Sequence, residues 1–114
     1  MTYRIYRLKE TDDNVIHRFM GSKSLTQHDF WPPKPEAYEE IWQGTIHGAE
    51  HTRVLDQIYT KFNVDKPMLF RTRYHSMSVG DIVMLTDNDK TIAYFCDNFG
   101  WTELPEFYAA VADT

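Results

Sequence analysis

Residues 82–96 have the sequence IVMLTDNDKTIAYFC, in which two apolar runs flank a polar segment. Residues 82–85 are all apolar, and a run this short is typical of a buried strand. The polar segment at residues 87–90 is Asp-Asn-Asp-Lys, and Asn and Asp accept the positive φ angles of tight turns. Residues 91–96 return as the second strand. This stretch therefore predicts a β-hairpin with a buried first strand.

Two further strands are predicted in the first half of the chain. Residues 3–8 place Tyr3 and Ile5 on one side and other bulky side chains on the opposite side, which suits a pleated sheet. Residues 38–46 alternate around Ile41, which predicts a second, partly exposed strand.

The clearest helix is predicted at residues 52–62. Charged and polar residues occupy one face, and apolar side chains recur at i, i+3, i+4 and i+7 on the other, at Leu55, Ile58, Tyr59 and Phe62. Asn63 is expected to end this helix in a left-handed conformation, and Pro67 prevents its continuation.

Two other helices are expected. Capping residues at 11–14 precede a helix of about three turns that stops at Gly21, with an apolar face made of Val15, Ile16, Phe19 and Met20. Residues 104–111 are expected to form a closing helix, with a proline in its first turn.

Residues 21–36 are predicted to form a long loop, because their three prolines exclude a helix interior or a central strand. Phe30 and Trp31 are expected to anchor this loop to the core. The predicted helices and strands are mixed along the chain and do not follow a regular βαβ alternation. Residues 1–114 are therefore predicted to form a single α+β domain, with a small, mostly antiparallel sheet of about four strands and two or three packed helices.

Composition excludes several classes of protein. The 114 residues are 42% hydrophobic and 15% aromatic, which is enough to build a core. The formal net charge is −5 and no long basic stretch occurs, so direct binding to nucleic acid is disfavoured. The single cysteine, Cys96, excludes an internal disulfide and suits a reducing compartment. No signal segment or apolar run of bilayer length is present, which favours a cytoplasmic protein without a membrane partner.

One motif suggests an enzyme. Residues 47–51, His-Gly-Ala-Glu-His, fit the H-x-x-E-H pattern of inverted zinc peptidases, in which two histidines one helical turn apart bind zinc and the glutamate activates water. A zinc hydrolase using His47, Glu50 and His51 is therefore one alternative. It requires a stable helix at Gly48 and a third ligand with a recognisable spacing, and the sequence shows neither.

A second cluster contains the residue types of a nucleophilic triad, at His75, Ser76, Ser78 and Asp81. The same residues are those of a polar turn that leads into a strand, because serine and aspartate bond turn amides and Gly80 permits unusual φ angles. Glycine-rich phosphate-binding motifs are absent. We therefore expect no catalytic residue, no metal and no cofactor.

Aromatic residues beside loops are the remaining signal. Trp31, Phe99 and Trp101 lie at turns or strand ends, where aromatics serve as core plugs or as the anchors of a protein interface. At least one of them is a candidate anchor for a protein partner.

Most of the chain resembles a known family, and the resemblance is clearest in the second half, beside an N-terminal Tyr-x-Ile-Tyr-x-Leu strand. The segments that carry the resemblance are residues 55–63, His75-Ser76-Met77-Ser78-Val79-Gly80-Asp81-Ile82-Val83, and Asp97 followed by Gly100-Trp101. Together they are similar to the YodL-like family of small bacterial proteins. The chain departs from the family pattern by Met77 in place of leucine, by Gly80, and by Trp101 in place of phenylalanine.

The resemblance implies a bacterial protein of the kind found in Firmicutes and on their mobile elements. It implies a non-enzymatic module that binds a host protein and modulates or inhibits it. The residues that carry over as candidate binding residues are His75, Ser76, Ser78, Asp81, Asp97 and Trp101, beside the aromatics Trp31 and Phe99. An alternative is an anti-defence inhibitor of the antirestriction or anti-CRISPR type, whose negative charge would block the basic groove of a nuclease.

Overall fold

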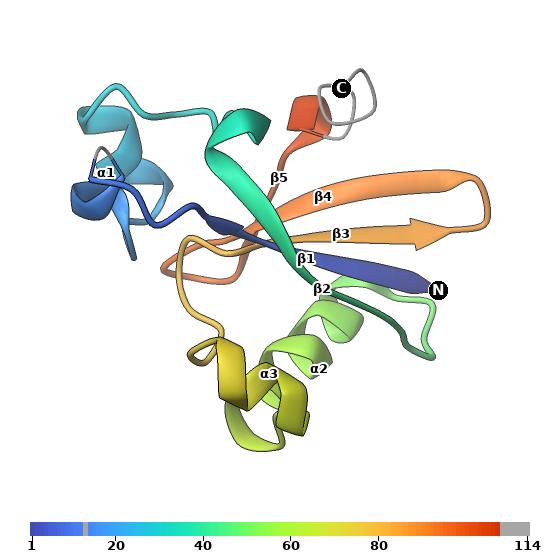
Figure 1. Cartoon of the computed structure of the whole chain (residues 1–114). Coiled ribbons are helices and arrows are strands. Elements are labelled where there is room, and N and C mark those ends of the chain that lie inside the picture. The colour runs from blue at the N-terminus through green and yellow to red at the C-terminus, as the bar shows by residue number, and fades with distance from the viewer. Residues whose placement is uncertain (13, 108–114) are drawn as a thin grey trace.

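Five antiparallel strands form one open sheet in the order β2-β1-β3-β4-β5 (Figure 1). The computed structural model describes residues 1–12 and 14–107. The strands within them are β1 (Thr2–Leu8), β2 (Tyr38–Thr45), β3 (Ile82–Asp87), β4 (Lys90–Cys96) and β5 (Trp101–Glu103). The predicted α+β class with an antiparallel sheet is confirmed. The described residues contain one strand more than expected, because the chain after the turn at residues 97–100 returns to pair with β4.

The predicted hairpin is confirmed as the β3–β4 pair, whose strands are joined by Asn88 and Asp89. Asn88 adopts a φ of 57°, the left-handed conformation expected of asparagine in a tight turn. β1 lies between β2 and β3 and pairs with both. Its side chains are buried on both faces of the sheet, so β1 belongs to two cores.

The first core lies between the sheet and α2 (His51–Val64), whose buried side chains are Val54, Leu55, Ile58 and Phe62. The predicted helix is thus confirmed, but its end was misplaced. Asn63 remains helical, and its side chain donates a hydrogen bond to the Tyr59 carbonyl one turn earlier. Tyr59, placed on the apolar face, is 38% exposed.

A short helix that the sequence did not reveal, α3 (Met68–Arg73), follows α2. It contributes Phe70, which is fully buried and contacts the rings of Phe62 and Trp42. The rest of α3 is exposed. Figure 1 shows α2 and α3 together below the sheet.

The second core lies on the opposite face and includes Tyr6, Leu8, Phe95 and Leu104. Leu25 enters it from α1 (Ser22–Gln27). The loop between α1 and β2 contains the 3₁₀ turn η2 (Pro35–Ala37).

The prediction of a helix over residues 15–20 was wrong. Only the 3₁₀ turn η1 (Val15–His17) forms there, and Val15 and Ile16 are 56% and 61% exposed. The helix cannot continue because Phe19 takes a φ of 65°, which is incompatible with a right-handed helix. α1 instead begins at Ser22, inside the stretch predicted to be a loop.

Trp31 anchors the rest of that loop, as expected, with its ring at 5.0 Å from the ring of Phe95 and nearly perpendicular to it. Residues 105–107 are helical, Leu104 precedes the helix, and residues 108–111 of the predicted closing helix lie outside the described residues. None of the helices in the described part of the chain has the length and apolar character needed to cross a membrane.

Candidate functional site

Three loops meet at the end of the sheet opposite the β3–β4 hairpin, and we call this region the loop end (Figure 1). It consists of residues 15–22, 75–81 and 97–100. The Gly80 amide donates to the Cys96 carbonyl, and the backbone of Gly80 lies beside that of Phe19. Gly80 has a φ of 101°, a conformation that side chains disfavour, so glycine is required at this crossing.

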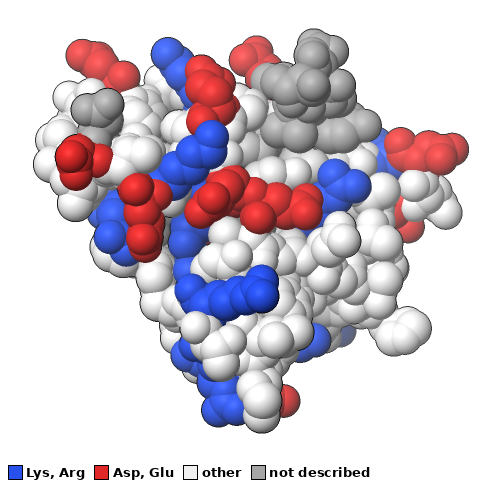
Figure 2. All heavy atoms as spheres, in the orientation of Figure 1, with Lys and Arg blue, Asp and Glu red and all other residues white. Residues whose placement is uncertain are grey.

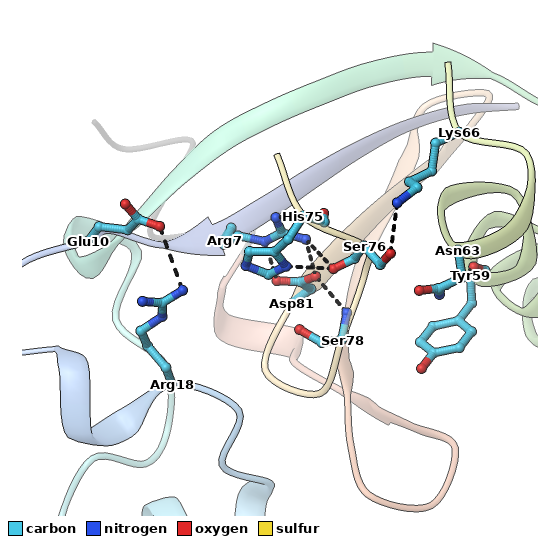
Figure 3. A network of polar contacts seen from close by, with 10 residues as sticks. All are labelled: Arg7, Glu10, Arg18, Tyr59, Asn63, Lys66, His75, Ser76, Ser78 and Asp81. Carbon is cyan, nitrogen blue, oxygen red and sulfur yellow. Dashed lines mark hydrogen bonds and ion pairs between the residues drawn. The ribbon is translucent and has the colours of Figure 1, made fainter. Parts of the chain in front are cut away.

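A buried ion pair between Arg7 and Asp81 holds the 75–81 loop to the sheet (Figure 3). Arg7 Nε lies 2.9 Å from Asp81 Oδ1, and Arg7 Nη2 lies 2.7 Å from Asp81 Oδ2. Arg7 is 8% exposed and Asp81 is 3% exposed. Two parallel hydrogen bonds of this kind fix the guanidinium and carboxylate planes relative to each other.

The remaining donors of Arg7 bind the loop backbone. Nη1 lies 3.1 Å from the His75 carbonyl and Nη2 lies 3.2 Å from the Ser76 carbonyl, while the Ser78 amide donates to Asp81 Oδ2 at 3.0 Å. The loop therefore folds around the ion pair, which is satisfied on both sides. This accounts for the position of Asp81 without catalysis.

The four triad-like residues are close together but are not arranged as a triad. His75 Nδ1 contacts the Ser76 carbonyl oxygen, and Lys66 donates to the Ser76 hydroxyl at 3.0 Å (Figure 3). Within the described residues, no hydrogen bond joins His75 to a serine hydroxyl. A nucleophile–base contact of the kind that activates serine is therefore missing from this turn.

Asp97 organises the neighbouring turn and the start of α1. Its carboxylate accepts hydrogen bonds from the amide and hydroxyl of Ser22, from the Asn98 amide and from the Thr102 hydroxyl. The N-cap of α1 is Gly21, which has no side chain to offer, so Asp97 supplies the missing acceptor from another part of the chain. A Cβ at Gly21 would lie 2.8 Å from Asp97 Oδ1, which two backbone amides hold in place, so a larger residue at this position would disturb the carboxylate.

We expect Asp97→Asn to lower the free energy of unfolding by about 1–2 kcal/mol at neutral pH. Burial alone would raise the pKa of Asp97, but the hydrogen bonds from Ser22, Thr102 and Asn98 outweigh it and hold the pKa below the ordinary value of 3.8. A lowered pKa in the folded state contributes stability above the unfolded pKa, and this is lost as the pH falls through the folded value. Urea titrations at pH 7 and pH 3 should therefore show the difference between the two proteins shrinking in acid. An unchanged difference would contradict the role of the carboxylate.

Exposed apolar side chains surround this framework. Phe99, at the tip of the turn that Asp97 organises, is 98% exposed. Val15, Ile16 and Phe19 are all more than half exposed, and the Phe19 ring lies 5.7 Å from the His75 ring. Phe99 was among the predicted binding residues, whereas Val15, Ile16 and Phe19 were expected on the apolar face of a helix.

Trp31 and Trp101 pack against the two cores instead of projecting from the loop end. Trp31 packs on Phe95 in the second core, and Trp101 is half-buried on the α2 side, where its Nε1 donates to Asp56 at 3.2 Å. Of the two aromatics at residues 97–101, Phe99 projects into solvent and Trp101 does not. Six of the eight predicted residues belong to the loop end, namely His75, Ser76, Ser78, Asp81, Asp97 and Phe99.

The H-x-x-E-H segment does not have the geometry that a zinc hydrolase requires. His47 and Glu50 are exposed in the loop before α2, where Gly48 has a φ of 147°. His51 begins α2, and its Nδ1 lies 2.7 Å from the Tyr94 hydroxyl. The two imidazoles are therefore not one helical turn apart. In the part of the chain that the structure describes, no group of three or more His, Cys, Asp or Glu residues is placed to hold a metal ion.

Cys96 is buried at the end of β4. Burial, together with the charges of Asp81 and Asp97, raises the pKa of its thiol from 9.0 to about 12. We therefore expect alkylation of the native protein by iodoacetamide at pH 8 to be at least about a hundredfold slower than alkylation in urea, because the thiolate is the nucleophile. Equal rates in the two conditions would contradict this.

Arg7 was not among the residues predicted for the site. A signal was present, because Arg7 follows Tyr3 and Ile5 at two-residue spacing and therefore shares their inward face. A charge on a buried face requires a buried partner. The partner, Asp81, is 74 positions away, and only the folded chain identifies it.

A pocket at the loop end is too small for a substrate. Its lining includes Arg18, Phe19, His75 and Gly80, and its volume of about 20 Å³ is enough for about one water molecule. The loop end is therefore a surface of exposed side chains rather than a cavity.

No curated protein and no solved structure matches the chain. The family model of the YodL-like domain matches residues 2–107, a span that includes all five described strands and the whole loop end. The chain therefore belongs to the YodL-like domain family.

Proposed function

We propose that this domain acts in the cytoplasm by binding a protein partner through the loop end, and that binding modulates or inhibits that partner without catalysis. The observation that carries the proposal is Phe99, a phenylalanine with 98% of its surface exposed on a turn held in place by Asp97. A large apolar side chain gains most when it enters a pocket on another protein.

The framework of the turn favours binding. The Asp97 amide donates to the Gly100 carbonyl at 3.0 Å, and the Asp97 carboxylate is bonded to Ser22 and Thr102. Because the backbone is already ordered, little conformational entropy is lost when Phe99 is immobilised. Only the side chain has to be fixed.

The 15–22 loop extends the surface, and Ser22 joins this loop to the Phe99 turn by its hydrogen bonds to Asp97. Val15, Ile16 and Phe19 add apolar area from the 15–22 loop. Arg18, which lies over the Phe19 ring and is paired with Glu10 at 3.6 Å, supplies polar groups beside them. Apolar side chains bordered by charged groups are the usual composition of a protein interface.

Site-specific photo-crosslinking tests the proposal in living cells. A photoreactive phenylalanine analogue placed at position 99 should give a discrete protein adduct, because Phe99 would enter the partner. The same analogue at Gln43, an exposed position on the β2 edge, is the control. The adduct at position 99 should disappear when Phe19→Ser and Ile16→Ser are introduced into the same chain.

Absence of an adduct at position 99, or an identical set of adducts from positions 99 and 43, would overturn the proposal. Circular dichroism of each variant excludes loss of folding as the cause. Phe99 belongs to neither hydrophobic core, so its replacement should leave the circular dichroism spectrum unchanged.

A further inference from the structure

The corner formed by the end of α2 and by α3 differs in charge from the rest of the protein. Residues 61–73, which we call the basic corner, contain four cations and one anion, namely Lys61, Lys66, Arg71, Arg73 and Asp65. Their formal charge is +3, so the other residues carry −8 of the total of −5. Figure 2 shows basic and uncharged side chains at the lower tip of the molecule, with most of the acidic side chains of this face above them.

The cations of the basic corner are available to a ligand. Ion pairs among the described residues involve Arg4, Arg7 and Arg18, and none involves a cation of the corner. Lys61, Arg71 and Arg73 are exposed. Lys66 is half-buried and donates to a neutral hydroxyl, so its charge is not compensated by a carboxylate.

Aliphatic side chains lie among these cations. Val64, Met68 and Leu69 are 80%, 72% and 64% exposed. Val64 is the last residue of α2, and Met68 and Leu69 are the first two of α3, whereas the next residue, Phe70, is buried in the core. Water is a poor environment for three such neighbours, and in a soluble domain a patch of this kind marks a contact surface.

We propose that the basic corner docks on an anionic membrane surface, with Val64, Met68 and Leu69 inserted at the headgroup boundary and the cations placed on the lipid phosphates. The domain would lie on the bilayer without spanning it. The proposal therefore departs from the expectation of no membrane partner, which rested on the absence of an apolar run of bilayer length. The inference goes beyond the proposed function, because it concerns a different surface and requires no protein partner.

The shape and chemistry of the corner favour lipid over the other anionic ligands. The corner projects from the molecule (Figure 2), and a projecting group of aliphatic side chains fits a fluid surface that closes around it. Protein hot spots are richest in Trp, Tyr and Arg, and the exposed apolar residues here include no aromatic. The same absence removes the stacking platform that single-stranded nucleic acid uses.

Screening allows the corner to act despite the negative total charge. The Debye length is about 8 Å at physiological ionic strength, whereas the molecule measures 36 × 31 × 28 Å. A bilayer at the corner is therefore attracted by the nearby cations more than it is repelled by distant carboxylates. Each cation near an anionic membrane adds to the binding, and the effect declines with salt.

Sedimentation with vesicles measures this directly. We expect the protein to bind vesicles of phosphatidylcholine mixed with phosphatidylglycerol at low salt, and not vesicles of phosphatidylcholine alone. Arg71→Gln with Arg73→Gln should weaken binding at least about tenfold, and Met68→Ser with Leu69→Ser should weaken it several-fold. Arg53→Gln with Lys23→Gln removes two exposed cations elsewhere and should have little effect.

A fluorescent probe reports insertion separately from attraction. Because Cys96 is buried, a Leu69→Cys variant can be labelled selectively with an environment-sensitive dye. The emission should shift to the blue with the anionic vesicles. The same dye at Ile16→Cys, an equally exposed apolar position on η1, should not shift.

Three outcomes would overturn the proposal. They are absence of binding to anionic vesicles at low salt, equal binding by the Arg71 and Arg73 variant, and equal blue shifts at positions 69 and 16. Tighter binding of duplex DNA or of an acidic peptide than of the vesicles would also overturn it and would assign the corner to that ligand. None of these results bears on the crosslinking at position 99.

Discussion

Replacing Asp81 by Ala should lower the free energy of unfolding by about 3–5 kcal/mol, as expected when one member of a buried ion pair is removed. Arg7 would keep its charge in a position that is 8% exposed, with only the His75 and Ser76 carbonyls as partners. The Ser78 amide would lose its acceptor as well. Urea denaturation followed by circular dichroism gives the measurement.

An exposed ion pair between β1, the strand of Arg7, and β2 supplies the control. Arg4 and Glu40 lie 3.7 Å apart on the surface, with side chains 52% and 39% exposed. Solvent weakens such pairs, so Glu40→Ala should cost less than about 1 kcal/mol. Equal effects of Asp81→Ala and Glu40→Ala would contradict the view that the Arg7–Asp81 pair holds the 75–81 loop. Arg7→Met combined with Asp81→Leu should recover part of the loss, because no unpaired charge then remains buried.

The second large effect is expected in the first core, where Phe62→Ala should cost about 3–5 kcal/mol. Phe62 is fully buried, and its ring contacts those of Tyr3, Trp42 and Phe70 at centroid distances of 6.2, 6.1 and 4.7 Å. Truncation leaves a cavity bordered by three rings that are held by different elements and cannot close around it. The free energy of unfolding in urea again gives the comparison.

Phe99→Ala is the matched control, since it makes the same chemical change at a position that is 98% exposed. Its effect on stability should stay within about 0.5 kcal/mol. If Phe62→Ala leaves too little folded protein to titrate, Phe62→Leu keeps most of the apolar volume, and its loss should fall between those of the other two. A loss from Phe62→Leu no larger than that from Phe99→Ala would contradict the packing described.

The elements that could be predicted are those whose pattern is local and repeated. The β3–β4 hairpin combines a short apolar run with turn residues that tolerate positive φ, and α2 maintains its apolar spacing over several turns. α3 has only six residues, which is too short for its period to be recognised. The helix expected at residues 15–20 was predicted from the spacing of its apolar residues alone. The helix in this part of the chain begins at Ser22 instead, where the Asp97 carboxylate accepts a hydrogen bond from the Ser22 amide, and sequence spacing does not reveal that distant partner.

The candidate site was predictable in composition but not in role. The polar turn at residues 75–81 was recognised from its serines, glycine and aspartate. That Asp81 serves as the buried partner of Arg7 depends on a contact between β1 and the start of β3, which sequence spacing does not contain. Phe99 differs from Trp31 and Trp101 in that its side chain is exposed to solvent. Exposure depends on which residues the folded chain covers, and the sequence pattern does not show this.

The position of β1 in the middle of the sheet has a consequence for synthesis on the ribosome. β1 and β2 are translated early, but the other neighbour of β1 is β3, which begins at Ile82. Until that segment emerges, one edge of β1 has no strand to pair with, although its side chains are apolar on both faces. The nascent chain therefore exposes an apolar, unpaired strand until β3 has been synthesised, and chaperones protect such segments during that period. Completion of the sheet, and with it the closure of the Arg7–Asp81 contact across 74 positions, waits until the residues of β3 have left the ribosome.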